Sequence, residues 1–347
     1  MVPAILESAD GCQASEKPLR LWGVPVKWAS LVLLTFVTTW TIFSIKLARS
    51  SSQEYRNSSV VLFTELFKLA LSFAFLSLET KSPMAAVRSF WIECRTKPLA
   101  MLKLCVPGLA YTIQNNLIFL SVDFLSAAVQ QVTYQLKILT AALLSVVMLK
   151  RTVGRKRWIA LCILVAGVML VQVPRNAEVS SVPRMQHKAP GTTGATRAFM
   201  GFLAALGACF ASGFGGVFME MVLKGSATSI WLRNAQLAIF GASTAAWVVF
   251  QEGHEAPLVH GYTFWVWLMA FTVASGGMLV AAVLKYADNI LRQFSTAISV
   301  ILTTALSALV LEDITLDMMF AAGTVLTIGA TFMYSGMLDD FLPKWMQ

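Results

Sequence analysis

The apolar residues of this chain are gathered into runs of about 20 residues, the length at which one α-helix crosses the ~30 Å hydrocarbon core of a bilayer. Mean hydropathy is +0.68. Hydrophobic residues make up 57% of the 347 residues and charged residues only 13%, whereas soluble domains carry about 25% charged residues. The sequence therefore predicts an all-α integral membrane protein and argues against a soluble globular domain.

The apolar runs predict ten transmembrane helices. We place them at 27–48, 57–79, 100–120, 125–149, 156–174, 198–222, 230–251, 263–286, 290–311 and 314–337. The longest polar stretches are 80–99 and 175–197, and the prolines and glycines of the second are typical of a mobile linker. We expect a cytosolic N-terminal segment (1–26), a five-helix repeat (27–174), a linker loop (175–197), a second five-helix repeat (198–337) and a cytosolic C-terminal tail (338–347).

A short internal echo supports two repeats. The stretch ILTAAL at 138–143 resembles ILTTAL at 301–306, in the fourth predicted span of each half. Because five is an odd number of spans, two such halves are inserted upside down relative to each other. Inverted repeats are a hallmark of secondary transporters, whose substrate lies near the membrane midplane.

Clusters of Lys and Arg between the apolar runs set the predicted topology. The clusters within 17–27, 81–97 and 150–157 fall on one side of the membrane, which the positive-inside rule identifies as the cytosol. Both termini are then cytosolic. This pattern accounts for the net charge of +9, so we do not assign that charge to nucleic-acid binding. Residues 1–20 contain no long apolar run, so we expect the first span, rather than a cleavable signal peptide, to direct insertion.

Polar side chains recur along single faces of the third and fourth predicted spans. Residues separated by three, four or seven positions share a helix face, and this spacing joins Gln130, Tyr134 and Lys137 in one span and Tyr111, Gln114 and Asn115 in the other. Charged groups within a membrane are costly and usually face a partner or an aqueous cavity. The stripes predict either contacts with a polar solute or hydrogen bonds between helices.

The second half offers fewer polar groups. Lys285 ends a span, where it either extends to the headgroups or, together with Lys137, binds a phosphate-bearing solute. We expect Arg233 to anchor at the headgroups and Asn234 to point inward. In span two, the spacing of Glu65 and Lys68 predicts a structural ion pair.

Small residues concentrate in the sixth and eighth spans. They allow close helix packing or make room for a flat ring beside the backbone, and they are Gly201, Gly207, Ser212, Gly213, Gly215, Gly216, Gly276 and Gly277.

The residues that enzymes use are poorly placed. The three histidines fall in predicted loops, and the five cysteines show no metal-ligand spacing, so we expect neither a metal nor a cofactor. Glu65 and Glu220 are the only acids well inside predicted spans, and they lie on separate helices. A membrane-embedded glycosyltransferase requires an acidic cluster or a large extramembrane domain. The sequence therefore predicts no catalytic residues.

Four segments resemble the nucleotide-sugar transporter family, part of the drug/metabolite transporter superfamily. They are YTIQNNL (111–117), QVTYQLKILT (131–140), WLRNAQ (231–236) and KYADNIL (285–291). The resemblance extends over spans two to ten. Within the family, the chain is most similar to the UDP-galactose and UDP-N-acetylglucosamine branch.

This resemblance implies a multi-pass antiporter of the Golgi, or alternatively the endoplasmic reticulum. It would bring UDP-N-acetylglucosamine, UDP-galactose or both into the lumen in exchange for UMP, by alternating access and without a cofactor. The substrate would contact Tyr111, Gln114, Asn115, Gln130, Tyr134, Lys137, Ser212, Asn234, Gly277 and Lys285. The alternatives are exchange of CMP-sialic acid for CMP and a membrane scaffold that transports nothing, and a homodimer is compatible with all three.

Two departures bear on the choice of sugar. The family usually has a tyrosine at the position of Gln130, and a Tyr-Phe-Glu-Lys segment where this chain has residues 218–221, Phe-Met-Glu-Met.

Overall fold

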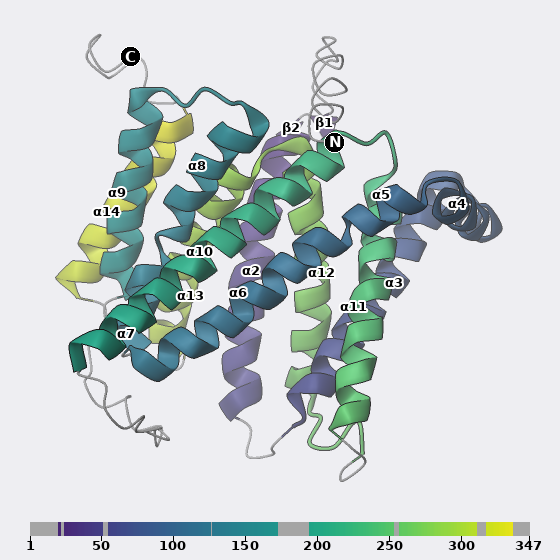
Figure 1. Cartoon of the computed structure of the whole chain (residues 1–347), viewed down its shortest axis with the longest axis horizontal. Helices are drawn as coiled ribbons and strands as arrows, with labels where there is room; N and C mark the ends of the chain where they lie inside the picture. The colour runs from purple at the N-terminus through teal and green to yellow at the C-terminus, as the bar shows by residue number, and fades with distance from the viewer. Residues whose placement is uncertain are drawn as a thin grey trace. The chain divides into compact units, whose positions relative to one another are not determined.

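The computed structural model describes residues 20–21, 24–50, 55–125, 127–172, 194–252, 257–310 and 317–335 (Figure 1). The predicted C-terminal tail, residues 1–19 of the predicted N-terminal segment and residues 175–193 of the predicted linker lie outside these ranges. Two strands of two residues each, β1 (Arg20–Leu21) and β2 (Val24–Pro25), pair antiparallel.

Helices make up nearly all of the remaining described chain, which confirms the predicted all-α class there. They are α2 (Val26–Ser50), α3 (Asn57–Thr80), α4 (Pro83–Thr96), α5 (Pro98–Lys103), α6 (Cys105–Phe124), α7 (Ala127–Tyr134), α8 (Lys137–Leu149), α9 (Arg155–Gln172), α10 (Gly194–Lys224), α11 (Ile230–Gln251), α12 (Phe264–Tyr286), α13 (Asn289–Val310) and α14 (Met318–Ser335).

Seven segments among the described residues are long and apolar enough to cross a membrane. They are Val26–Ile45, Asn57–Thr80, Val132–Leu149, Ala198–Lys224, Phe264–Tyr286, Asn289–Val310 and Met318–Ser335. Each lies on a predicted span. The other predicted spans correspond to α6, α9 and α11, which carry more amide and basic side chains. An integral membrane protein accounts for this pattern, while ten spans and their inverted repeat stay predictions.

The polar stretch 80–99 contains the helix α4. Lys81 adopts a left-handed conformation (φ 57°) that ends α3. The Ser82 hydroxyl then accepts a hydrogen bond from the Ala85 amide, and Pro83 occupies the first turn, which is a typical helix start. Phe90, with Ala86, packs into a cluster with buried residues of α3 and α11. This helix is therefore part of the packed structure rather than a loose connection.

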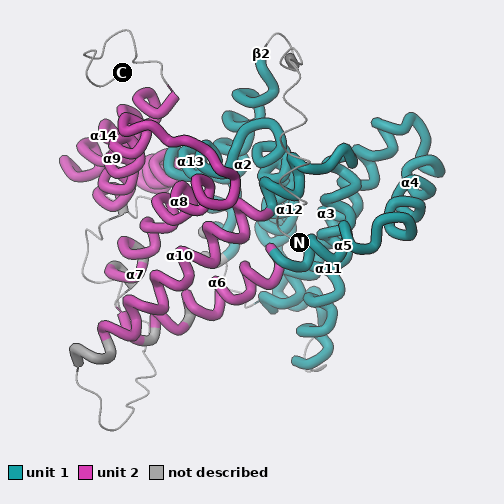
Figure 2. Tube along the Cα trace, turned by 45° about the horizontal axis from the view of Figure 1, so that its top comes forward, with its two compact units in different colours: residues 1–106, 219–299 teal, residues 107–218, 300–347 magenta. Residues whose placement is uncertain are grey.

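The chain forms two compact units (Figure 2). Unit 1 comprises residues 1–106 and 219–299, and unit 2 comprises residues 107–218 and 300–347. Each unit draws on both of the predicted sequence repeats. The repeat prediction concerns internal symmetry rather than compactness, so it stays a prediction.

Unit 1 is built on the contacts of α2 with α12 and of α3 with α11 and α12. Hydroxyl side chains also join α2 to α13. Ser295 Oγ donates to the Leu31 carbonyl at 2.9 Å, and Ser299 Oγ donates to the Thr35 carbonyl at 3.0 Å. These bonds satisfy hydroxyl groups in an environment where water is scarce.

Unit 2 contains a helix pair in backbone contact. A Cβ atom on Gly323 of α14 would lie 2.7 Å from the Gly167 carbonyl oxygen of α9, a distance that real Cβ atoms do not adopt. Only glycine permits this approach, as in small-residue helix contacts of other membrane proteins. The pair α9–α14 therefore depends on two glycines far apart in the sequence.

Candidate functional site

The predicted fourth span is not one helix. It is interrupted at Gln135 and Leu136, between α7 and α8. There the amides of Gln135 and Leu136 donate to the carbonyls three residues before them, Val132 and Thr133, at 3.1 Å each. This tighter turn keeps the backbone amides satisfied while α8 begins afresh at Lys137. Interrupted helices recur at the binding sites of secondary transporters.

Two predicted site residues of unit 2 meet across the interruption. The Lys137 ammonium lies 4.3 Å from the centroid of the Tyr134 ring, in a cation–π contact. A cation in the first turn of a helix is disfavoured by the helix dipole, and the ring offsets part of that cost. The third member of the stripe, Gln130, is buried in α7. The Lys137 ammonium, next to the positive end of the α8 dipole, favours an anion.

The polar face of α6 is also in unit 2. Gln114 Nε2 lies 3.4 Å from Asn115 Oδ1, to which it donates, whereas Gln114 Oε1 is buried without a hydrogen-bond partner among the described residues. An unsatisfied buried acceptor costs about 1–3 kcal/mol. A donor on a bound solute would remove that cost, and so would an ordered water.

Helix α10 packs against both α6 and α8 through its small residues (Figure 2). A Cβ atom on Gly215 would lie 3.4 Å from ring atoms of Tyr111, and one on Gly213 would lie 3.1 Å from the Ala141 amide nitrogen. The Thr140 hydroxyl donates to the Cys209 carbonyl at 2.9 Å. At these glycines the lack of a side chain permits close helix packing, which is one of the two predicted roles. Ser212 is buried in the same stretch.

The predicted ion pair of Glu65 and Lys68 forms in unit 1. Lys68 Nζ donates to Glu65 Oε1 at 2.7 Å. Glycines make room for both side chains, because a Cβ atom on Gly241 would lie 2.5 Å from the Glu65 carboxyl carbon and one on Gly277 would lie 3.0 Å from Lys68 Cε. Gly277 thus borders the ion pair, and its predicted contact with the substrate stays a prediction.

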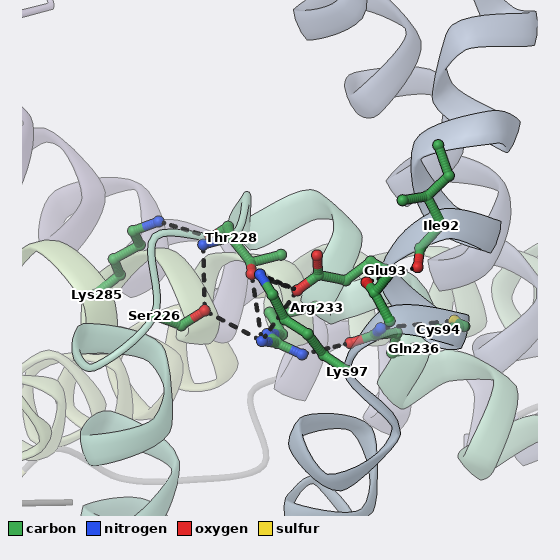
Figure 3. A network of polar contacts seen from close by, with 10 residues as sticks. Ile92, Glu93, Cys94, Lys97, Ser226, Thr228, Arg233, Gln236 and Lys285 are labelled. Atoms are coloured by element: carbon green, nitrogen blue, oxygen red, sulfur yellow. Dashed lines mark hydrogen bonds and ion pairs between the residues drawn. The ribbon is translucent and has the colours of Figure 1, made fainter.

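The prediction for Arg233 was wrong. Its side chain does not extend outward to solvent but is buried, only 3% exposed, in a polar network within unit 1 (Figure 3). Its guanidinium donates to Gln236 Oε1 at 2.9 Å and to Ser226 Oγ at 3.1 Å, and lies 3.6 Å from Glu93 Oε1. The loop after α10 supplies the Ser226 and Thr228 hydroxyls as acceptors. These hydrogen bonds compensate for the cost of burying the cation.

Glu93 of α4 is the anionic member of this network. Its carboxylate accepts from the Thr228 hydroxyl at 2.7 Å and pairs with Lys97 at 3.2 Å. Burial alone would raise the pKa of this carboxyl. The hydrogen bonds from Thr228 and Lys97, with the charges of Lys97 and Arg233, outweigh burial and hold the pKa of Glu93 below its ordinary value. Glu93 is therefore ionised at neutral pH.

Lys285 joins the network through the same loop residue. Its ammonium donates to the Thr228 carbonyl at 3.2 Å, so Thr228 contacts Glu93 with its hydroxyl and Lys285 with its backbone (Figure 3). Lys285 is partly buried at the last turn of α12. Nearby in the sequence of α11, Asn234 is buried and its Nδ2 has no hydrogen-bond partner among the described residues. Unit 1 thus contains two groups that a substrate could engage, the Lys285 ammonium and the Asn234 side-chain amide.

Comparison with known proteins decides the family. The profile of the nucleotide-sugar transporter family matches residues 23–335. This chain belongs to the nucleotide-sugar transporter family. The resemblance predicted from the sequence is confirmed, and so is the prediction of a transporter rather than an enzyme, since the family and the relatives below are transporters.

Several curated relatives are similar over most of the chain. The human UDP-N-acetylglucosamine transporter is 38% identical over 317 residues, covering 89% of this chain and 95% of its own length. A Caenorhabditis elegans UDP-N-acetylglucosamine/UDP-N-acetylgalactosamine transporter is 38% identical over 322 residues, covering 89% and 93%. The mouse UDP-galactose translocator is 38% identical over 316 residues, covering 89% and 78%.

The fold is also found among solved structures. One crystal structure matches with a TM-score of 0.62 at 16% sequence identity. The match covers 91% of this chain and 99% of the chain in the crystal structure. At this identity the match shows a shared fold alone.

The sequence did not predict several residues of the polar network around Arg233 in unit 1. Gln236 is fully buried, and Thr228 links the Glu93 carboxylate to the Lys285 ammonium. Gln236 stands within the quoted segment WLRNAQ, so its position was a usable signal. Glu93 and Thr228 lie in stretches without an apolar run, and no residue spacing in the sequence connects them.

No donor set for a metal ion stands out. Among the residues that the structure describes, no three His, Cys, Asp or Glu side chains gather closely enough to hold one.

Proposed function

We propose that this protein is a nucleotide-sugar antiporter that moves UDP-N-acetylglucosamine, UDP-galactose or both from the cytosol into the Golgi lumen in exchange for UMP. One observation carries the proposal: relatives at 38% identity over 89% of the chain bear the names UDP-N-acetylglucosamine transporter and UDP-galactose translocator. The family match over residues 23–335 supports transport of a nucleotide sugar in general.

The two lysines would bind the phosphates. A nucleotide sugar and its nucleoside monophosphate both carry phosphate, and ammonium groups pair with phosphate in a charge-assisted manner. Lys137 in unit 2 and Lys285 in unit 1 supply one such group each. On binding, Lys285 would exchange its hydrogen bond to the Thr228 carbonyl for one to a phosphate oxygen.

The unsatisfied amide atoms would bind the neutral parts of the substrate. Gln114 Oε1 is an acceptor and Asn234 Nδ2 is a donor, and both are buried without partners among the described residues. Uracil and sugar hydroxyls offer donors and acceptors that complement them. Tyr111, Asn115, Gln130, Tyr134, Ser212 and Gly277 would complete the lining.

Transport would follow alternating access between two inverted five-helix repeats, with ten spans and both termini cytosolic. The sugar nucleotide and UMP would occupy the same phosphate site in turn, which makes their exchange possible. Placement in the Golgi membrane follows from the substrate class; the endoplasmic reticulum is the alternative location.

Counterflow uptake in proteoliposomes tests the proposal. Purified protein is reconstituted in vesicles loaded with UMP, with CMP or with buffer, and uptake of labelled UDP-N-acetylglucosamine, UDP-galactose and CMP-sialic acid is measured. We expect UDP-sugar uptake only in UMP-loaded vesicles. CMP-dependent uptake of CMP-sialic acid would replace the proposal by the CMP-sugar alternative, and absence of any trans-stimulated uptake would favour a scaffold.

A further inference from the structure

Glu220 is a fully buried carboxylate near the end of α10, inside a segment apolar enough to span the membrane. One carboxylate oxygen, Oε1, accepts from Lys224 Nζ at 2.7 Å. The other, Oε2, accepts from the backbone amide of Asn289 at 2.9 Å. All three residues belong to unit 1.

The ion pair holds the junction between α12 and α13 from both sides. Asn289 is the first residue of α13, and its amide is one of the donors that a helix start leaves unpaired. Lys224 Nζ donates in turn to the carbonyl of Ala287, the residue that follows α12. One side chain thus secures the end of α12, and its partner secures the start of α13.

Lys285 lies two positions before the secured Ala287 carbonyl. Its ammonium donates to the carbonyl of Thr228, in the loop that directly follows the α10 turn bearing Lys224. The same short stretch of chain therefore fixes the backbone beside Lys285 and contacts its ammonium. A shift of this junction would move the lysine.

Stability alone gives a weak reason for such an arrangement. A buried ion pair often contributes less to folding than apolar residues of similar volume would. A rigid supporting contact, by contrast, is what a binding cation requires to hold its productive geometry.

We propose that Glu220, together with Lys224, is a positioning residue that holds the Lys285 ammonium where it meets the substrate phosphate. This inference rests on the proposed phosphate role of Lys285. Glu220 itself contacts the helix junction and Lys224, and it acts on the substrate through Lys285.

The test compares a ligand with phosphate to one without it. Binding of UMP and of uridine is measured by thermal-shift titration of purified wild-type protein, Glu220→Gln, Lys285→Ala and the double variant. Glutamine keeps the size of the side chain and an acceptor for the Asn289 amide but loses the ion pair. We expect Glu220→Gln to weaken UMP binding by about tenfold and to change uridine binding by less than about twofold.

The double variant separates positioning from general damage. If Glu220 acts through Lys285, Glu220→Gln has no further effect on UMP binding in the Lys285→Ala background. Equal weakening of UMP and uridine, or an undiminished effect in that background, would overturn the inference. Should Glu220→Gln fail to fold, Lys224→Gln provides the second variant, since Lys224 is partly exposed and the same selective loss of UMP binding is expected.

The proposed function fails separately. If Lys285→Ala leaves the ratio of UMP to uridine affinity unchanged, Lys285 is not a phosphate partner, and the positioning role falls with it. If Lys285→Ala weakens UMP alone while both Glu220→Gln and Lys224→Gln bind UMP as wild type does, only the positioning role is wrong.

Discussion

Lys137 in unit 2 and Lys285 in unit 1 are cations held in different ways. Lys137 lies over the Tyr134 ring at the start of a helix, where the positive end of the helix dipole adds to the positive potential. Lys285 donates to a carbonyl within a network in which Glu93 offsets the charge of Arg233. The first arrangement favours attraction of an anion, and the second favours a rigid frame. We therefore expect Lys137 to dominate substrate affinity and the unit 1 network to dominate stability.

The largest effect is expected from Lys137→Ala. Removing a partly desolvated cation from a phosphate site costs about 2–5 kcal/mol, so UDP-sugar/UMP exchange in proteoliposomes should fall about 100-fold. The melting temperature should change little. Lys137→Arg is the matched control, because arginine keeps both the charge and the cation–π contact. Full exchange by the alanine variant would contradict the assignment of Lys137.

Arg233→Met should instead lower the stability of the protein. The substitution leaves several acceptors of a buried network without their donor, so we expect a loss of about 2–3 kcal/mol in unfolding free energy. Thermal denaturation of the purified protein measures it. Arg56→Met is the control, since Arg56 pairs at 2.7 Å with the half-exposed Glu252 and donates to the Val249 carbonyl, and loss of these contacts should cost about 1 kcal/mol. Equal losses in the two variants would remove the distinction between the sites.

Tyr134 allows a finer test of the Lys137 site. Tyr134→Leu removes the ring, and loss of a cation–π contact of about 1 kcal/mol corresponds to roughly fivefold weaker UMP binding. Tyr134→Phe keeps the ring and should weaken binding less. UMP titrations of both variants decide the matter. If leucine and phenylalanine behave alike, the ring does not hold the ammonium.

The smallest effect is a pH dependence confined to unit 1. The pKa of Glu93 is lowered below 4.5, chiefly by hydrogen bonds from Thr228 and Lys97 that outweigh the effect of burial. A depressed carboxyl pKa contributes stability that is full above the ordinary value and is lost as pH falls through the folded value. The difference in melting temperature between wild type and Glu93→Gln should stay constant above about pH 5 and shrink below it. A difference that grows on acidification would show the opposite sign of shift.

The predicted sites differ in how far the sequence determined them. Tyr134 and Lys137 are three residues apart, and the contact follows from local geometry that a helix and a tight turn both provide. Glu65 and Lys68 are the same case. Helix positions followed equally well from the apolar runs, because segregation of apolar residues is a local property of the chain.

The unit 1 network depended on contacts that local patterns do not encode. Arg233 at a predicted helix start resembles a headgroup anchor, and its burial depends on Glu93, 140 positions earlier in the numbering. The same holds for Glu220, whose partner Asn289 lies 69 positions away. Tertiary acceptors decide whether a buried charge is tolerated, and a single sequence does not reveal which acceptors come near.

The glycine contact of α9 with α14 has a consequence for biosynthesis. Helix α9 is translated long before α14, yet in unit 2 it packs on that last described helix. In unit 1, Thr35 likewise cannot form its 3.2 Å hydrogen bond until Ser295, 260 residues later, has been synthesised. Neither unit is complete until the C-terminal part of the chain has been made. The early helices must therefore persist in the bilayer with unfilled packing surfaces, and a chain severed within 175–197 would release two fragments that each need the other to fold.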